Sequence, residues 1–505
     1  MIKLPVLTNL KDVGTAQIIK FGGINRSMLW SSGELKDSSG LSSTLFPALS
    51  QRASREKLTG YTAPTSIFAK GKLCVVDGTN FLYDGAVKGT VTAGEKLFAA
   101  VNTKIVIFPD KKYYDTAADV FGDLECTYVS AAGTLTFAAG SIVTTGTAFA
   151  LKVGDGIKIT GCTANAVNNK SAVVRAVSAD GKTLTFDSDI FTAGTETGAV
   201  TLARTVPALE NICEHDNRLW GTAGQTIYGS ALGDPTNFNV FDGVSTDSYA
   251  VAVGSDGEFT GCAAYAAHIC FFKEDKIHKL YGTKPSNYQL DTYDYAGVMK
   301  GSAKSLVTIN ETLYFHGRAG VYAYYGGAPD LISEKFGARR YSGARAGTDG
   351  ERYYISLLYG GGNELMVYDP LMGIWLKDGE ARISDFCTLD GTMYMLGADG
   401  IYRCGTGTER VEWMAEFAPF TENTEGKKYV SRISMRMTVT GTVKAEISYD
   451  GAPYEVIFTD GSSKQRLVNI PVPIRRCDTF SIRLSGVGEC LIQSLVRQVS
   501  VGSEV

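Results

Sequence analysis

One hairpin pattern recurs seven times along the chain. Each copy has a small or polar pair, two to four alternating apolar residues, a turn, and an apolar–aromatic strand that usually ends in tyrosine. The copies at residues 310–322 and 390–402 match almost position by position. The first apolar residues of the seven copies are Leu73, Ile105, Leu219, Ile269, Leu313, Tyr353 and Met393.

The spacing of these copies predicts a β-propeller. The later copies follow one another at about 40–50 residues, and repeats of that length built only of strands are typical of propeller blades. Helical repeats are excluded because the apolar residues alternate with period two. We expect seven blades, or six if the closely spaced copies at Leu73 and Ile105 share one. The terminal tyrosines should pack between blades, and the strand Ala16–Phe21 should close the ring.

Between Ile105 and Leu219 the chain is too long for one blade by roughly 70–80 residues. The excess alternates strictly between apolar and polar residues, with hairpin turns, from Leu151 to Phe186. That pattern predicts a small β-barrel over residues 125–204, inserted into the propeller and able to fold independently.

The chain of 505 residues is also too long for a single core, because hydrophobic cores stop growing near 250–300 residues. From about Val411 the repeat stops and cleanly alternating strands follow, which predicts a C-terminal β-sandwich. The expected fold is all-β, with these parts: residues 1–60, an N-terminal segment with the propeller-closing strand; 61–124, the first part of the propeller; 125–204, the barrel; 205–410, the second part of the propeller; and 411–505, the sandwich.

Composition narrows the functional classes. The formal charge is −4, from 49 Lys and Arg against 53 Asp and Glu, which argues against a protein that clamps DNA through its phosphates. The beginning of the sequence lacks a basic stretch followed by an apolar core, so we expect no secretory signal. No apolar run reaches about 18 residues, so no membrane span is expected. The ten scattered cysteines are expected to be buried reduced thiols.

The sequence contains few motifs of the kind found in catalytic or metal-binding sites. The four histidines, His215, His268, His278 and His316, are too far apart for a metal motif. The segment Ser178–Thr183 faintly resembles an Asp-box but is expected to be a hairpin turn, like the glycines 360–362. We therefore expect no catalytic, cofactor-binding or metal residue, no cofactor, and no enzymatic activity. Two carboxylates that meet at the propeller mouth, as in a polysaccharide hydrolase, remain a less favoured alternative.

Four phrases carry a family resemblance. They are the blade ending Ile227–Phe238, the segment from Leu45-Phe46-Pro47 to Arg55, and the Val153-Gly154-Asp155 and Asn168-Asn169 phrases of the insertion. Together with the architecture, they resemble virion β-propeller proteins of tailed bacteriophages, of the packaged-DNA stabilisation, tail-nozzle or tail-hub type. The family offers no catalytic residue to carry over.

The resemblance implies a structural role in the phage particle. It implies a homo-oligomeric ring, most often of six copies, at the neck or tail, which closes or lines the DNA exit path and docks tail parts. The implied partners are adaptor, portal or tail-fibre proteins, with at most weak contact with DNA in transit. The implied location is the virion, after synthesis in the cytoplasm of the bacterial host. The alternative is a receptor- or carbohydrate-binding propeller of a phage tail.

Overall fold

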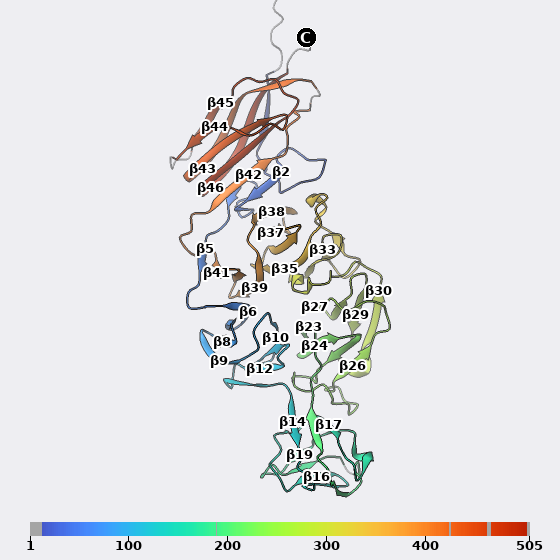
Figure 1. Ribbon diagram of the computed structural model, residues 1–505. Coiled ribbons are helices and arrows are strands. Elements are labelled where there is room, and N and C mark those ends of the chain that lie inside the picture. Colours follow the sequence, from blue (N-terminus) through green and yellow to red (C-terminus); the bar gives the residue numbers. More distant parts are fainter. Residues whose placement is uncertain (1–12, 188, 424–425, 462–465, 502–505) are drawn as a thin grey trace, which may run out of the picture. The chain divides into compact units, whose positions relative to one another are not determined.

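The computed structural model describes residues 13–187, 189–423, 426–461 and 466–501 (Figure 1). The chain forms two compact units: unit 1 comprises residues 1–61, 319–323 and 330–505, and unit 2 comprises residues 62–318 and 324–329. Across the described residues the only helices are short 3-10 turns, η1 (Ala166–Asn168), η2 (Pro285–Asn287), η3 (Ala303–Ser305) and η4 (Glu334–Phe336). None of them has the length or the apolar character needed to span a membrane.

Outside the insertion, the repeats form seven four-stranded antiparallel sheets in the described chain. Unit 2 holds β6 (Pro64–Lys70), β7 (Lys72–Asp77), β8 (Asn80–Tyr83) and β9 (Ala86–Thr90); β10 (Leu97–Val101), β11 (Lys104–Phe108), β12 (Lys112–Asp115) and β13 (Val120–Asp123); β23 (Asn211–His215), β24 (Arg218–Ala223), β25 (Thr226–Gly229) and β26 (Tyr249–Ala252); and β27 (Gly261–Tyr265), β28 (His268–Phe272), β29 (Ile277–Tyr281) and β30 (Gln289–Tyr293).

The boundary between the units falls within the sheet of β31 (Val307–Ile309), β32 (Thr312–His316), β33 (Val321–Tyr324) and β34 (Asp330–Leu331). Unit 1 holds the last two sheets. They are built from β35 (Ser342–Thr348), β36 (Tyr353–Tyr359), β37 (Gly362–Asp369) and β38 (Ile374–Gly379), and from β39 (Ile383–Leu389), β40 (Thr392–Gly397), β41 (Gly400–Cys404) and β5 (Arg55–Lys57).

These sheets confirm the β-propeller. Each of the seven marker residues lies on the second strand of its own sheet: β7, β11, β24, β28, β32, β36 or β40. The copies at Leu73 and Ile105 belong to separate sheets, so the described chain has seven blades and not six. The fold is therefore all-β and propeller-based, with both additional domains described below.

Apolar side chains from neighbouring sheets form the cores between blades. In unit 2, Phe81 of β8 packs against Tyr114 of β12, with ring centroids 5.7 Å apart, and Tyr83 lies 5.0 Å from the same ring. Trp220 of β24 and Phe271 of β28 meet in the same way at 6.4 Å. Since a sheet cannot bury both faces alone, this packing between blades supplies most of the burial of each strand.

The insertion is a small β-barrel, as the sequence predicts. One sheet contains β14 (Cys126–Val129), β22 (Thr201–Arg204), β17 (Gly156–Thr160) and β18 (Ser171–Val173). The other contains β19 (Ala176–Val177), β20 (Thr183–Thr185), β16 (Ser141–Thr144), β15 (Leu135–Ala138) and β21 (Gly194–Thr195). Both sheets contribute to one core of their own, which includes Phe137, Ile157 and Leu202.

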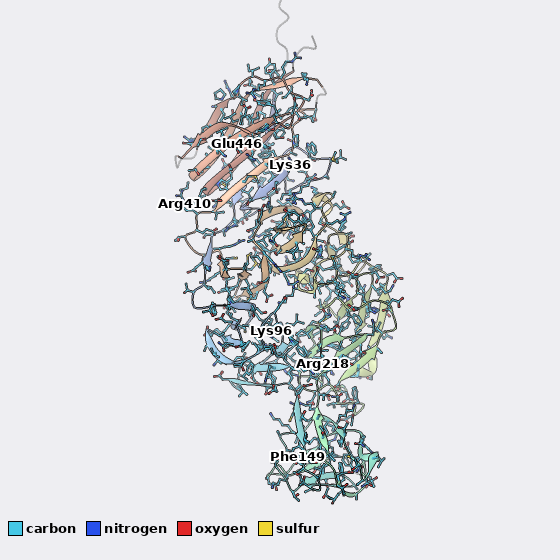
Figure 2. The ribbon with its side chains drawn as sticks, viewed as in Figure 1. Lys36, Lys96, Phe149, Arg218, Arg410 and Glu446 are labelled. Atoms are coloured by element: carbon cyan, nitrogen blue, oxygen red, sulfur yellow. The ribbon has the colours of Figure 1, made fainter. Side chains whose placement is uncertain are left out.

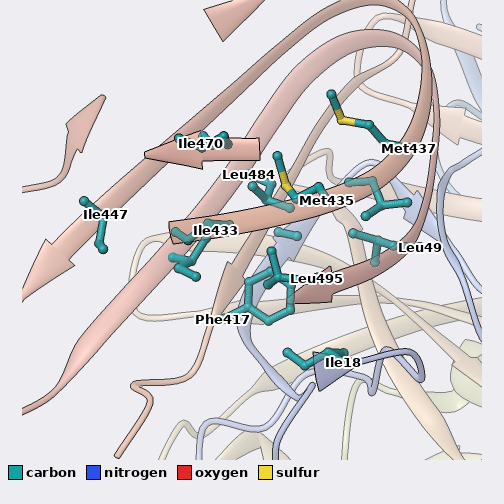
Figure 3. Packing of buried hydrophobic residues seen from close by; sticks show 14 of the residues in the cluster. Ile18, Leu49, Phe417, Ile433, Met435, Met437, Ile447, Ile470, Leu484 and Leu495 are labelled. Carbon is teal, nitrogen blue, oxygen red and sulfur yellow. The ribbon is translucent and has the colours of Figure 1, made fainter. Parts of the chain in front are cut away.

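The C-terminal β domain is one nine-stranded sheet that folds around a buried core (Figure 3). Its strands are β1 (Val13–Ile18), β2 (Leu35–Ser39), β3 (Leu41–Ser42), β4 (Leu49–Gln51), β42 (Glu412–Phe417), β43 (Lys428–Tyr449), β44 (Glu455–Asp460), β45 (Arg466–Pro471) and β46 (Phe480–Val501). The long strands β43 and β46 pair over their whole length. Gly441 faces Gly488 in this ladder, and a Cβ on Gly441 would lie 2.0 Å from the Val487 carbonyl oxygen, so only glycine fits there.

One sequence prediction about closure is wrong. The strand expected at Ala16–Phe21 overlaps β1 at residues 16–18, and β1 pairs with β46 at the register Ile18–Leu495 and not with a blade. The short strand β5 pairs with β41 in the last blade instead. Ile18 and Phe21 are 3% and 2% exposed in the C-terminal core, and this burial determines the pairing. Alternation of apolar and polar residues predicts a strand, but it does not predict which strand will pair with it.

We expect the propeller to fold without the insertion. Replacing residues 126–204 by a short Gly-Ser linker removes a core that shares no cluster with the blades. Glu125 should be kept, because its Oε1 accepts a hydrogen bond from the Val206 amide at 3.0 Å. Chemical denaturation of the deleted protein should remain cooperative, and the isolated barrel should unfold cooperatively too. A broad, non-cooperative transition in the deleted protein would contradict this expectation.

Candidate functional site

Three of the four histidines are buried and hydrogen-bonded. His278 lies between the hydroxyls of Ser255, at 3.1 Å from Nε2, and Thr292, at 2.8 Å from Nδ1. His268 and His316 are also buried, and burial lowers the pKa of all three imidazoles to about 4. His268 and His278 therefore pack within a blade. In the described part of the chain, no three His, Cys, Asp or Glu side chains cluster as metal ligands would.

The Asp-box-like segment is a hairpin turn, as expected. Asp180 accepts hydrogen bonds from the Ser178 hydroxyl at 2.5 Å and from the Lys182 amide at 3.0 Å, between β19 and β20. Gly181 takes the turn with a φ of 68°. Gly360 and Gly361 likewise form the turn between β36 and β37.

Four carboxylates that no sequence motif marks do come together in unit 2. A cleft of about 340 Å³ is lined by Asp256, Glu258, Glu274 and Asp275, together with Lys300 and Arg318. Lys300 donates to Glu258 at 2.5 Å, and this contact holds the pKa of the carboxyl below its usual range. Because the four acids come from two different loops, their spacing in the sequence gives no signal.

The blade-ending phrase that carries the family resemblance forms an anchored loop, residues 230–248. Arg218 of β24 is fully buried, and its guanidinium donates to the Ser230, Asp247 and Ser245 carbonyls, the last at 2.6 Å (Figure 2). Both ends of the loop are thereby tied to one side chain. A buried arginine is tolerated only where such acceptors surround it.

The polar residues of the phrase form hydrogen bonds within this loop and to the inserted barrel. Asp234 accepts bonds from the Thr236 amide at 3.0 Å and from Asn237 Nδ2 at 2.6 Å. Asn237 Oδ1 in turn accepts the Gly156 amide of the inserted barrel at 3.1 Å. The loop nevertheless leaves three apolar side chains in water, which we call the blade-loop patch: Leu232, Phe241 and Val244, exposed by 44%, 59% and 52%.

A second anchored loop lies in the N-terminal segment of unit 1. Asn25 is 5% exposed; its Nδ2 donates to the Leu29 carbonyl at 2.8 Å, and its Oδ1 accepts the Ser27 amide at 3.0 Å. Glu34 accepts the Ser31 amide at 2.6 Å and closes the loop. Met28 and Leu29, which we call the loop tip, are 88% and 86% exposed. The sequence reasoning missed this tip, although the apolar run Met-Leu-Trp between serines was visible.

Next to this loop lies an open cleft of about 720 Å³, the Trp30 cleft. It is lined by Asn25, Arg26, Ser27, Trp30, Lys36, Asp37, Phe336, Ala338, Arg339, Glu416, Ala418 and Pro419. Trp30 is 38% exposed, and its indole N–H donates to the Pro419 carbonyl at 2.8 Å, which fixes the ring. These residues come from β2 and the loop before it, from β42 and the segment after it, and from η4 and the segment that follows it, so no local motif marks the cleft.

A buried ion-pair network forms the wall of the Trp30 cleft. Arg26 binds both oxygens of Glu364 at 2.9 Å and also Asp37 at 2.9 Å. Tyr341 donates to Glu364 at 2.6 Å, and Arg339 binds the same carboxylate. Burial opposes the charge of Glu364, whose side chain is 1% exposed, but the hydrogen bonds from Arg26 and Tyr341 hold its pKa below the usual range.

Arg52 and Arg55, from the second phrase of the resemblance, line a third cleft of about 590 Å³ at the last blade. Arg52 binds Glu409 at 2.7 Å and Arg55 binds Asp378 at 2.6 Å. Both arginines are mostly buried, so their main role here is to join β4 and β5 to the blade. All ten cysteines are free thiols, six of them buried.

No model of a known protein family matches the chain, and neither does any curated protein sequence. Similar solved structures include the exo-β-1,3-galactanase of Phanerochaete chrysosporium with galactose (9% identity, TM-score 0.23, covering 55% of this chain and 92% of that one). They also include the endosialidase of phage phi92 (10%, 0.27, 76% and 74%) and the dihydro-heme d1 dehydrogenase NirN (10%, 0.29, 87% and 81%). At these identities the likeness concerns the fold alone.

These neighbours contradict one sequence-based expectation. The chain was expected to have no enzymatic activity because motifs were absent, yet structures similar to it are named as a galactanase and an endosialidase. The expectation is therefore not retained. The likeness assigns this chain no substrate and no catalytic residue.

The Glu364 network yields a stability prediction. In a Glu364→Ala variant, Arg26 loses its main partner while still mostly buried, so the free energy of unfolding should fall by about 3–5 kcal/mol. Urea denaturation measures this change. Glu258→Ala, which removes an exposed partner of Lys300, is the matched control and should unfold almost as the unmodified protein does. Equal stability of the two variants would contradict the network's role.

The same carboxyl predicts a pH dependence. Its folded-state pKa is lowered, so its contribution is complete above the unfolded value near 4.5 and is lost as the pH falls through the folded value. The stability gap between the unmodified protein and Glu364→Gln should therefore be largest near neutral pH and narrow below pH 4.5. Urea midpoints measured from pH 7 to pH 3 test this, and a gap that widens on acidification would refute it.

Proposed function

We propose that this chain is a structural component of a tailed-phage particle, located at the neck or tail, where copies form a ring and dock other virion proteins. The observation that carries the proposal is a pair of apolar surfaces held in water by anchored loops. They are the loop tip of Met28 and Leu29 in unit 1 and the blade-loop patch of Leu232, Phe241 and Val244 in unit 2.

The anchoring of these loops matters more than their exposure alone. Single apolar side chains at a surface are ordinary, and a flexible loop could fold them against the protein. Here Asn25 and Arg218 fix the two backbones through buried hydrogen bonds, so the apolar groups stay in solvent. Apolar surface kept rigidly exposed favours protein contact, because a partner can cover it without ordering the loop first.

Two different patches also suit a ring. A contact between copies that closes into a ring is heterologous, which means that one surface of a subunit binds a different surface of the next. The six-copy ring and the adaptor, portal or tail-fibre partners follow from the family resemblance. The charge of −4 fits weak contact with DNA in transit, and ten free thiols fit synthesis in a reducing host cytoplasm.

The two patches should be needed for assembly. We expect Met28→Ser/Leu29→Ser, and separately Phe241→Ser/Val244→Ser, to reduce ring formation strongly, because each removes apolar area from a contact. Mass measurement of the purified protein and imaging of particles provide the readout. Leu371→Ser, at a position 86% exposed in the turn between β37 and β38, is the matched control and should assemble normally.

The position of the protein in the particle tests the proposed function. The unmodified protein should lie on the tail axis of particles, whether its ring forms in solution or only on the particle. A chain that stays monomeric in solution and is absent from the tail axis would overturn the proposed function.

A further inference from the structure

We propose that the Trp30 cleft is a saccharide-binding site. The inference is independent of the proposed virion role. The cleft adjoins the loop tip of Met28 and Leu29, because Ser27 and Trp30 of the same loop line it. It rests on four features: the size of the cleft, one half-exposed aromatic ring of fixed orientation, planar polar side chains around that ring, and a rigid wall.

Size and shape favour a small ligand over a protein partner. The cleft holds about 720 Å³, within the range of roughly 300–1,000 Å³ that small-molecule sites occupy. A protein contact of ordinary size needs about 800 Å² on each partner and an apolar centre. The cleft lining is instead mixed, since five of its residues, Arg26, Lys36, Asp37, Arg339 and Glu416, carry charge.

Trp30 supplies a stacking surface. Its N–H is bonded to the Pro419 carbonyl at 2.8 Å, so the ring does not rotate, and 38% of the residue is exposed. The other three tryptophans, Trp220, Trp375 and Trp413, are at most 2% exposed. Sugar rings present a flat face of C–H groups that packs on such an aromatic surface, while their hydroxyls point to the sides.

Polar groups of the kind that bind hydroxyls line the same cleft. Arg339 is 42% exposed and stacks over Tyr359; its described ion pair with Glu364 uses only Nη1, which leaves further N–H donors in its planar fork. Glu416 binds Lys36 through Oε1 at 3.1 Å, and Lys36 is 61% exposed (Figure 2). A carboxylate and a guanidinium each form paired hydrogen bonds with neighbouring hydroxyls.

Contacts within the protein hold the wall of the cleft in place without a ligand. Arg26 is fixed by Glu364 and Asp37, and Asn25 fixes the loop that carries Trp30. A ligand would therefore order few side chains on binding, which lowers the entropic cost of association. Neutral sugars suit the site best, because each charge that lines it already has a partner: Arg26 with Asp37, Lys36 with Glu416, and Arg339 with Glu364.

Tryptophan fluorescence tests the site directly, since Trp30 is the half-exposed indole of the four. The full chain is titrated with maltose, cellobiose, lactose and diacetylchitobiose, and binding is confirmed by calorimetry. We expect at least one disaccharide to change the emission with saturation. Trp30→Ala should weaken that binding roughly tenfold or more, and Trp30→Phe should retain most of it. Arg339→Ala, which removes a hydroxyl-binding group, should weaken it as well.

Matched controls separate binding from folding. Leu371→Ser should bind as the unmodified protein does, and the thermal midpoint of Trp30→Ala should stay close to that of the unmodified chain. If no disaccharide binds, or if Trp30→Ala binds equally well, the saccharide site is refuted. If no sugar binds and Trp30→Ala abolishes ring assembly, the cleft is a protein contact and the inference fails while the proposed function stands.

Discussion

Packing between neighbouring four-stranded sheets is the constraint on which the rest of this structure depends. A sheet of four short strands has two faces and cannot bury both alone, so each blade needs its neighbours. Rings such as Phe81 and Tyr114, or Trp220 and Phe271, fill the space between adjacent blades. The apolar side chains of the strands are therefore used to form the core. The two anchored loops described above lie outside these strands, where binding residues are common in proteins.

Buried charged side chains hold the surface loops against that core. Arg218 lies inside a blade and holds the carbonyls of a loop that displays Phe241, while Arg26 and Glu364 bind each other behind Trp30. Burying such groups is costly unless acceptors or opposite charges surround them, so each network tolerates few alternative arrangements. The exposed apolar and aromatic groups are rigid for this reason, and rigidity is what makes them suitable for binding.

The contradicted expectation about enzymatic activity has a physical explanation. A motif search finds catalytic groups that lie close together in sequence, as on one helix or one tight turn. In a propeller, acids from separate loops can converge, as Asp256 and Glu274 do around one cleft. The absence of a catalytic motif is therefore weak evidence against enzymatic activity in this fold. Proteins that share one fold often have unrelated functions.

The sequence by itself determined a propeller of six or seven blades and its inserted barrel, because strand alternation and repeat spacing are local properties of the chain. The separate sheets of the structure decided for seven. The sequence also marked the Ile227–Phe238 phrase, although not the role of Arg218 beneath it. Only the tertiary structure decided that β1 pairs with β46 and that β5 completes the last blade. It alone brought Trp30 and Arg339, some 300 positions apart in the sequence, into the lining of one cleft. Strand partners and converging side chains are chosen by burial and charge pairing between distant segments, and no local pattern records that choice.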